Sequence, residues 1–240
     1  MKQNFENYTT EDFSVWETLF NRQVKNLKDK SCKEYLSCLD QLSGVLKETS
    51  IPKFEELNNA LEQKTGWTIE VVPGLIPVED FFKLLSQKKF CSSTWLRSMV
   101  QLDYLEEPDM FHDIFGHIPL FMNKEYGDFA QKMGELGVRF KDSEQVLLEL
   151  QRLYWFTIEF GLLKGGVPKI YGAGIISSFG ETNFIYEKGA EILPFNLAEI
   201  IKTDFCNSQI QTKYFLLSSF EELYSSIFKY EKQLEELASC

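Results

Sequence analysis

The chain has two histidines, His112 and His117, and both lie in the stretch Pro108–Phe121, PDMFHDIFGHIPLF. Imidazole is a common ligand for metals such as iron and zinc. On a continuous α-helix, two residues five positions apart would diverge by roughly 140°, at about 100° per residue. A fold that brings both rings to one point must therefore change the helix between them. The simpler alternative is a buried pair that bonds each other or a carbonyl, and the spacing alone leaves both open.

The residues around the histidines predict where the helix begins and ends. Pro108 and Asp109 are typical of a first helical turn, where a missing N–H has no cost and the helix dipole favours a carboxylate. Gly116 is typical of a helix end, and Pro119 would prevent the helix from resuming. We therefore expect the first histidine to project from the last turn and the second to follow a reversal after Gly116, so that the rings converge.

A third ligand is expected from Glu159, in the apolar helical stretch Leu153–Leu162, LYWFTIEFGL. It is the only charged residue between Arg152 and Lys164. A carboxylate buried alone there would cost several kcal/mol or stay protonated, and a dication beside it removes that problem. The alternative is a glutamate that reaches the surface or pairs with Arg152 or Lys164. Two histidines and one carboxylate form the ligand set of the non-haem Fe(II) oxygenases.

Several sequence blocks resemble one enzyme family. HDIFGH, at residues 112–117, is similar to the HDxxGH/HExxGH motif of the pterin-dependent aromatic amino acid hydroxylases. Four more blocks match in order and spacing: VPGLIPVEDFF (Val72–Phe82), the stretch from Arg97 to DYLEEPD, LYWFTIEFGL (Leu153–Leu162) and IYGAGIISSFGE (Ile170–Glu181). The resemblance runs from about Tyr8 to about Phe228. It is closest to the bacterial, single-domain phenylalanine 4-hydroxylases.

The resemblance implies a monooxygenase that uses Fe(II), tetrahydropterin and O₂ to hydroxylate the ring of a free aromatic amino acid. Conversion of phenylalanine to tyrosine is the expected reaction, with His112, His117 and Glu159 holding the iron. At the position of Trp155, phenylalanine and tyrosine hydroxylases also resemble this chain in carrying tryptophan, whereas tryptophan hydroxylases carry phenylalanine. A single-ring substrate is therefore favoured. Asn207, in DFCNSQIQ, replaces an apolar residue of phenylalanine hydroxylases and an aspartate of tyrosine hydroxylases. Tyrosine or tryptophan as the preferred substrate therefore remains an alternative.

The same resemblance divides further residues between two sites. The pterin site would be formed by Gly74, Leu75, Ile76, Phe81 and Asp113. The amino acid site would be formed by Arg97, Tyr104, Trp155, Phe160, Gly174, Ser177, Ser178 and Asn207. Arg97 would clamp the substrate carboxylate, because a guanidinium binds a carboxylate bidentately. Tyr154 and Glu181 match positions near the metal. Without the resemblance, Phe81 would be a core ring, Arg97 a surface charge and Asp113 a solvent-facing acid.

Composition limits the partners. The formal net charge of −11 argues against nucleic acid or an anionic membrane, since both bind basic patches. The chain has no run of 18 apolar residues, and its first residues lack the apolar segment of a signal peptide. Five cysteines without a CxxC motif fit free thiols in a reducing cytoplasm, with a Cys32–Cys38 disulfide as the weaker alternative.

Apolar periodicity predicts one irregular, mainly α domain with a few short β-strands. Beyond the helix that carries the first histidine, helices are expected at about 9–27, 32–47, 52–61, 78–85, 124–140, 143–163, 197–203 and 220–237. Strands are expected at 67–72 and 214–217, a short β-like run in GGVPKIYGAGI, and a loop at 187–193, while residues 90–98 are ambiguous. The resemblance implies a single catalytic domain over 1–240, without the regulatory domain or tetramerisation helix of animal members, and hence a monomer.

Two other functional classes remain open. A zinc hydrolase could use the same three ligands with an activated water, although the chain lacks an HExxH motif. A non-catalytic helical interaction domain with a vestigial site would bind no metal and consume no oxygen.

Overall fold

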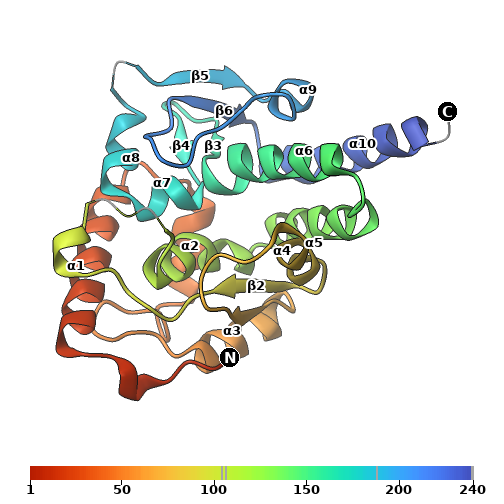
Figure 1. Cartoon of the computed structure of the whole chain (residues 1–240). Coiled ribbons are helices and arrows are strands. Elements are labelled where there is room, and N and C mark those ends of the chain that lie inside the picture. Colours follow the sequence, from red (N-terminus) through yellow and green to blue (C-terminus); the bar gives the residue numbers. More distant parts are fainter. Residues whose placement is uncertain (104, 106, 188, 239–240) are drawn as a thin grey trace.

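The computed structural model describes residues 1–103, 105, 107–187 and 189–238, and helices dominate this part of the chain (Figure 1). The first half contains α1 (Thr10–Leu27), α2 (Lys33–Gln41), α3 (Phe54–Lys64) and α4 (Val78–Ser86). The second half contains α5 (Lys124–Arg139), α6 (Glu144–Tyr154), α7 (Ala173–Ser177), α8 (Phe179–Phe184), α9 (Leu197–Ile200) and α10 (Phe220–Ala238). The mainly α prediction is confirmed.

The strands form two small sheets. β1 (Thr68–Val71) and β2 (Lys89–Ser92) pair in parallel. The other sheet has the order β4–β3–β6–β5, from β3 (Leu162–Leu163), β4 (Lys169–Ile170), β5 (Glu191–Pro194) and β6 (Lys213–Leu217). β6 is parallel to both β3 and β5, whereas β3 and β4 are antiparallel. Figure 1 shows the larger sheet at the top of the molecule and β2 near the bottom, with α5 and α6 between them.

Side-chain caps fix the starts of three long helices. Thr9 and Asp12 form a capping box at α1, in which the Thr9 N–H donates to Asp12 Oδ2 at 2.7 Å. Asn123 Oδ1 accepts from the Tyr126 N–H at 3.0 Å at the start of α5. Ser143 caps α6, as its sequence position predicts. These caps place the helices that carry and surround the candidate site.

Aromatic rings fill the core behind the histidine-bearing segment. Phe111 and Phe115, on either side of His112 in sequence, are fully buried and stack with centroids 4.8 Å apart. Trp16 of α1 packs edge-on against Phe111 at 5.5 Å, and Phe20 packs against Phe115 at 5.2 Å. Burial of one such ring stabilises the fold by about 1.5–3 kcal/mol. The segment that carries the histidines is therefore anchored to α1 through its apolar face.

Two glycines allow α4 and α5 to pack closely. A Cβ atom at Gly134 would lie 2.3 Å from the backbone nitrogen of Ser86, and one at Gly137 would lie 2.4 Å from the Phe82 ring. Neither distance is compatible with a side chain at these positions, so glycine is required for this helix contact. The contact matters for the site because α4 also carries Phe81.

Some predicted elements differ from the structure. The helix predicted at 32–47 ends at Gln41, and the periodic residues Leu42 and Leu46 are buried by turns instead. The expected loop at 187–193 contains the beginning of β5, which pairs with β6 at the edge of the sheet. The ambiguous stretch after Lys89 forms β2. Both strands depend on partners distant in sequence, which local propensity does not report.

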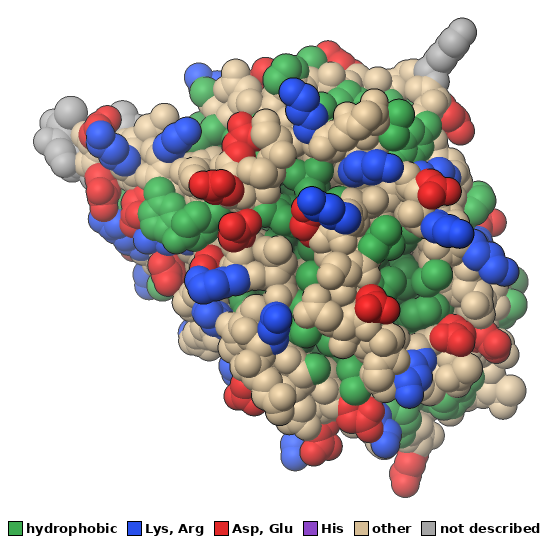
Figure 2. Space-filling view, turned by 180° about the vertical axis from the view of Figure 1, so that it is seen from behind, with side chains coloured by type: hydrophobic (Ala, Val, Ile, Leu, Met, Phe, Trp, Pro, Cys, Tyr) green, Lys and Arg blue, Asp and Glu red, His purple; other side chains and the backbone are tan. Residues whose placement is uncertain are grey.

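On the face opposite to that of Figure 1, acidic and basic side chains are interspersed, and neither sign forms one large patch (Figure 2). Among the described residues, no helix has the length and apolar character needed to cross a membrane. The thiols of Cys32, Cys38, Cys91 and Cys206 are free.

Candidate metal centre and cleft

The two histidines converge because the backbone between them is a π-helix. A short helical turn begins at Met110, a π-helix spans His112–His117, and a 3-10 helix follows over Ile118–Met122. Hydrogen bonding from residue i to i+5 places residues five apart on the same side of the helix. The two Nε2 atoms lie 3.1 Å apart. The predicted convergence is confirmed.

The predicted cause of this convergence is wrong. The chain does not reverse after Gly116, which lies inside the π-helix, and Pro119 lies in the first turn of the following 3-10 helix. A Cβ atom at Gly116 would lie only 3.0 Å from the carbonyl oxygen of Ala173, so this glycine provides space for α7 rather than a helix end. Asp109 precedes the helix as a cap, and its Oδ1 atom accepts from the His112 N–H at 3.0 Å.

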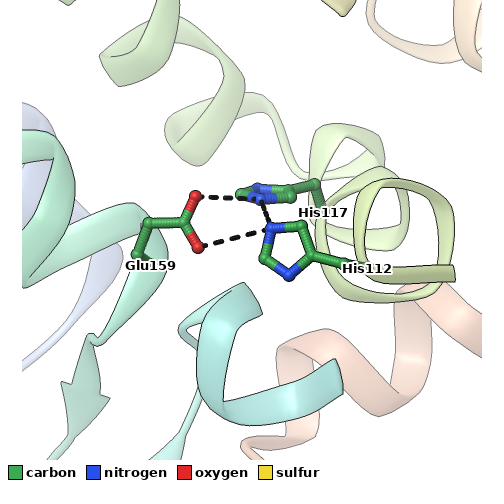
Figure 3. A group of neighbouring side chains, drawn as sticks. All are labelled: His112, His117 and Glu159. Carbon is green, nitrogen blue, oxygen red and sulfur yellow. Dashed lines mark hydrogen bonds and ion pairs between the residues drawn. The ribbon is translucent and has the colours of Figure 1, made fainter. Parts of the chain in front are cut away.

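Glu159 reaches the histidines from a second π-helix, Trp155–Glu159, which extends α6 (Figure 3). Its Oε1 atom lies 3.1 Å from Nε2 of His117, and its Oε2 atom lies 3.6 Å from Nε2 of His112. Arg152, which the sequence left as a possible partner of Glu159, instead donates to the Ile201 carbonyl at 3.0 Å and pairs with Asp204. The three expected ligands therefore form one cluster.

The charges of this cluster suit a cation. Burial opposes ionisation of Glu159, but His117 and His112 together lower the pKa of its carboxyl to about 2. Burial lowers the pKa of His112 to about 4, against the opposing effect of Glu159. At neutral pH the cluster therefore presents an ionised carboxylate and a neutral His112 imidazole, which are the protonation states that metal binding needs.

Ser177 of α7 fixes the tautomer of His112. The Ser177 hydroxyl donates its proton to the Ala173 carbonyl at 2.8 Å. The same oxygen lies 2.9 Å from Nδ1 of His112, so it can only accept there, and Nδ1 carries the proton. The lone pair of His112 is thus on Nε2, which faces Glu159 and His117. A hydrogen bond from the ring nitrogen that does not bind the metal is usual for metal-binding histidines.

The spacing of the donor atoms fits a metal with three protein ligands on one face. An ion about 2.1 Å from each donor, bound at right angles, holds its donors about 3.0 Å apart. The distances from His117 Nε2 to His112 Nε2 and to Glu159 Oε1 are both 3.1 Å. All three ligand atoms lie within 4.8 Å of one another. The donor set thus matches the facial arrangement of non-haem Fe(II) sites.

Two lobes of a cleft meet at this cluster. The first lobe has an empty volume of about 920 Å³ and the second about 1360 Å³. His112, Tyr154, Trp155 and Glu159 line both lobes. All the residues expected to bind the pterin line the first lobe: Gly74, Leu75, Ile76, Phe81 and Asp113. All the described residues expected to bind the amino acid line the second: Arg97, Trp155, Phe160, Gly174, Ser177, Ser178 and Asn207. Tyr104 lies outside the described residues.

The first lobe is mainly apolar, and besides Glu159 it contains one further acid, Asp113. Phe81 is half-buried and meets Tyr154 edge-to-face, with ring centroids 5.0 Å apart. Asp113 is buried rather than solvent-facing, and its Oδ2 atom accepts from the Ser93 N–H at 2.9 Å. Burial raises the pKa of Asp113 well above its usual range, against that hydrogen bond.

The second lobe contains a buried arginine. Arg97 is not the surface charge that the sequence left as an alternative, since its side chain is 7% exposed. Its Nε and Nη2 atoms donate to the two oxygens of Asp109, both at 2.8 Å. Burial would raise the pKa of Asp109, but the bonds and the charge of Arg97 lower it below its usual value. This pair fixes the guanidinium at the wall of the lobe.

Glu181, which the resemblance gave as an acid supporting the metal site, lines the second lobe together with His112 and Glu159. Its Oε1 atom accepts from the Gln211 N–H at 3.0 Å, and the Tyr214 hydroxyl oxygen lies 3.3 Å from its Oε2 atom. Sequence reasoning missed Gln211 and Phe205, which both contact Trp155 from the segment before β6. Asp109 was expected at the start of the histidine-bearing helix, but its ion pair with Arg97 was not.

Comparison with known proteins assigns the family. A family model described as biopterin-dependent aromatic amino acid hydroxylase matches residues 4–239. The chain belongs to this family. Its sequence is 41% identical over 229 residues to the phenylalanine-4-hydroxylase of Ralstonia nicotianae, an alignment that covers 94% of this chain and 72% of the relative. The relative from Pseudomonas aeruginosa is 41% identical over 223 residues, with 92% and 83% covered.

Solved structures of relatives have the same fold as this hydroxylase. The phenylalanine hydroxylase of Chromobacterium violaceum, crystallised with iron(III) and 7,8-dihydrobiopterin, is 39% identical and superposes with a TM-score of 0.90. The match covers 98% of this chain and 86% of that structure. The prediction of an irregular helical domain of the aromatic amino acid hydroxylase type is therefore confirmed.

Proposed function

We propose that this hydroxylase converts phenylalanine to tyrosine with Fe(II), a tetrahydropterin and O₂. The observation that carries the proposal is the meeting of two lobes at the His112, His117 and Glu159 cluster. Two organic molecules that bind in separate lobes would both reach the same metal ion. The names of the relatives and the cofactors of the solved relative support this assignment.

The three ligands would bind Fe(II) and leave the remaining coordination positions open. A structural zinc site, by contrast, closes its coordination sphere with protein ligands. When bound, the iron and the tetrahydropterin together supply the activation of O₂. The contribution of the protein is to keep Nε2 of His112 unprotonated through Ser177 and to keep Glu159 ionised. The zinc hydrolase and the non-catalytic domain are not favoured.

The pterin would lie in the first lobe. The backbone of Gly74, Leu75 and Ile76 would bind the polar edge of the ring, and Phe81 would stack on its face. The Leu75 N–H already donates at 3.1 Å to the carboxylate of Glu107, which lines the second lobe. The mainly apolar lining would help to exclude water once a pterin is bound beside the metal.

The amino acid would lie in the second lobe. Arg97 uses its Nε and Nη2 atoms on Asp109, so the remaining donors of its planar fork are available for the substrate carboxylate. Trp155 and Phe160 would pack against the substrate ring and direct it toward the metal. Trp155 is what favours a single-ring substrate over an indole.

We further propose that residues 1–240 form one catalytic domain that acts as a cytoplasmic monomer. One continuous core cluster runs from α1 to α10, and the four described thiols are free. Sedimentation of the purified chain at several concentrations tests the oligomeric state. A molecular mass that rises with concentration would contradict the monomer.

Product analysis with phenylalanine, tyrosine and tryptophan, each with Fe(II) and a tetrahydropterin, tests the function. We expect phenylalanine to give tyrosine as the main product, with some hydroxylation of the other two amino acids. Omission of the pterin or of iron should stop product formation in each case. Tryptophan as the best substrate would overturn the proposed preference. Hydrolysis by a zinc-loaded form, without oxygen consumption, would overturn the reaction class.

A further inference from the structure

Trp155 lines both lobes, and its ring is in contact with two other aromatic rings and with one hydrogen-bond acceptor. Phe160 lies against one side, with ring centroids 4.7 Å apart, and Phe205 stacks at 4.5 Å with an interplanar angle of 18°. Face contacts between rings set the tilt of the indole but resist rotation within its own plane only weakly. The edge is held by a hydrogen bond, in which Nε1–H donates to Oε1 of Gln211 at 2.9 Å.

Besides its bond to Trp155, Gln211 makes three hydrogen bonds. Its side-chain Nε2 donates to the Lys213 carbonyl at 2.7 Å, so the oxygen of the carboxamide has to face Trp155. Its backbone N–H donates to Glu181, and its carbonyl accepts from the Tyr214 hydroxyl. The side chain is buried and lines neither lobe. All the polar groups of Gln211 are therefore used, and its oxygen is a rigid acceptor.

The segment Asp204–Gln211 runs along the mouth of the second lobe. It is attached at its start by the Arg152–Asp204 ion pair and the Phe205 stack, and at its end by Gln211. Between these points the residues are exposed, and Asn207 and Ile210 line the lobe. Trp155 thus contacts both ends of this segment.

We propose that Gln211 is a positioning residue, whose carboxamide oxygen sets the in-plane orientation of Trp155 and thereby the shape of the amino acid lobe. This inference rests on the proposed function for the role of the lobe, but not for the hydrogen bond itself. A free indole N–H in a half-buried ring would seek another acceptor, and the ring would turn with it. The edge of Trp155 would then occupy space that the substrate ring needs.

Gln211→Met tests the hydrogen bond, because methionine keeps the length of the side chain but offers only a weak acceptor. The full chain is loaded with diamagnetic Zn(II), and the indole N–H signals are recorded by ¹⁵N–¹H NMR. The signal of Trp155 is identified by its loss in Trp155→Phe. We expect it to move upfield and exchange faster with water in Gln211→Met, while Trp16, which donates to the Lys47 carbonyl, stays unchanged. An unchanged Trp155 signal would overturn the proposal.

A double-mutant cycle tests the consequence for the substrate. We expect the KM for phenylalanine to rise about 2- to 12-fold in Gln211→Met, as loss of one hydrogen bond predicts, with a smaller change in kcat. In a Trp155→Phe background, which lacks the indole N–H, the same substitution should change KM little. An effect of equal size in both backgrounds would mean that Gln211 acts through Lys213 or the loop, and would overturn the proposal.

Gln211→Glu and Gln145→Met complete the design. Gln211→Glu retains an acceptor, so the Trp155 indole N–H signal should stay downfield. An upfield shift of this signal in Gln211→Glu would count against the proposal. Gln145 is exposed on α6, where it bonds Glu149, and its replacement by methionine should change neither the indole signal nor KM. If the wild-type chain hydroxylated no aromatic amino acid, the proposed function would fail, while the NMR comparison would still decide whether Gln211 orients Trp155.

Discussion

The Nε2 atom of His117 lies 3.1 Å from the Oε1 atom of Glu159, and each residue belongs to its own π-helical turn. We expect the wild-type chain to bind roughly one Fe(II) through these residues and His112. Alanine at His112, His117 or Glu159 should each abolish hydroxylation, because two remaining ligands hold the ion poorly. Metal analysis, activity and circular dichroism check this prediction.

Glu125→Ala, at an exposed position of α5, serves as the control for those variants and should keep both iron and activity. A ligand variant that kept iron and near-native turnover while remaining folded would show that the triad is assigned wrongly.

Phe81 should affect the pterin more than the amino acid. The ring lines only the first lobe, where it meets Tyr154 edge-to-face. Stacking contributes about 0.5–1.5 kcal/mol beyond burial, so Phe81→Ala should raise the KM for tetrahydropterin about 2- to 12-fold or more. Steady-state kinetics with each substrate varied in turn measure this split, and Phe228→Ala on α10 is the matched control. A selective loss of amino acid affinity would move Phe81 out of the pterin site.

Asn207 is expected to influence the choice between phenylalanine and tyrosine. Its amide is exposed at the mouth of the second lobe, where it can bond a phenol without a large desolvation cost. An unpaired amide costs about 1–3 kcal/mol only when buried, so the effect should be modest. Asn207→Ile or Asn207→Val should lower the ratio of tyrosine to phenylalanine turnover. Asn59→Ile, at an exposed site on α3, should leave it unchanged, and a constant ratio in all variants would remove Asn207 from specificity.

Glu181 should make folding stability fall as the pH rises toward neutrality. Burial raises the pKa of this carboxyl to about 7, despite the hydrogen bonds from Gln211 and Tyr214. The folded chain holds the proton more tightly than the unfolded chain, so the stabilisation is complete below the usual pKa of 4.5 and is lost as the pH rises through 7. The difference amounts to about 3 kcal/mol at most.

Denaturant unfolding of the wild type and of Glu181→Gln at several pH values between 4.5 and 8 measures this effect. The wild type should lose stability relative to Glu181→Gln across this range, whereas Glu199→Gln, at an exposed site on α9, should follow the wild type. Parallel curves for the wild type and Glu181→Gln would contradict the raised pKa.

The sequence predicted the ligands of the site better than the backbone that presents them. The i, i+5 spacing of His112 and His117 and the isolated charge of Glu159 were enough to propose one metal cluster. The expected reversal at Gly116 was wrong, because glycine also occurs where another backbone passes closely, as Ala173 does here. A π-helix satisfies the same spacing, but it has no local signal comparable to a cap.

Contacts between distant segments could not be predicted from local patterns. Gln211 and Phe205 reach Trp155 only because β6 joins the sheet beside β3 and β5. The bond from Ser177 to His112 depends on α7, which lies in a glycine-rich stretch where only a short β-like run was expected. Burial of Arg97 and Asp113 likewise follows from packing that their neighbours in sequence do not reveal.

The close contact between α4 and α5 helps to set the width of the first lobe. Gly137 faces the ring of Phe82, and Phe81 is the residue directly before Phe82 on α4. A side chain at either glycine of α5 would separate the two helices, push α4 toward the cleft and narrow the first lobe. Substitutions at Gly134 or Gly137 would therefore weaken the binding of the pterin cosubstrate, although neither glycine lines the cleft.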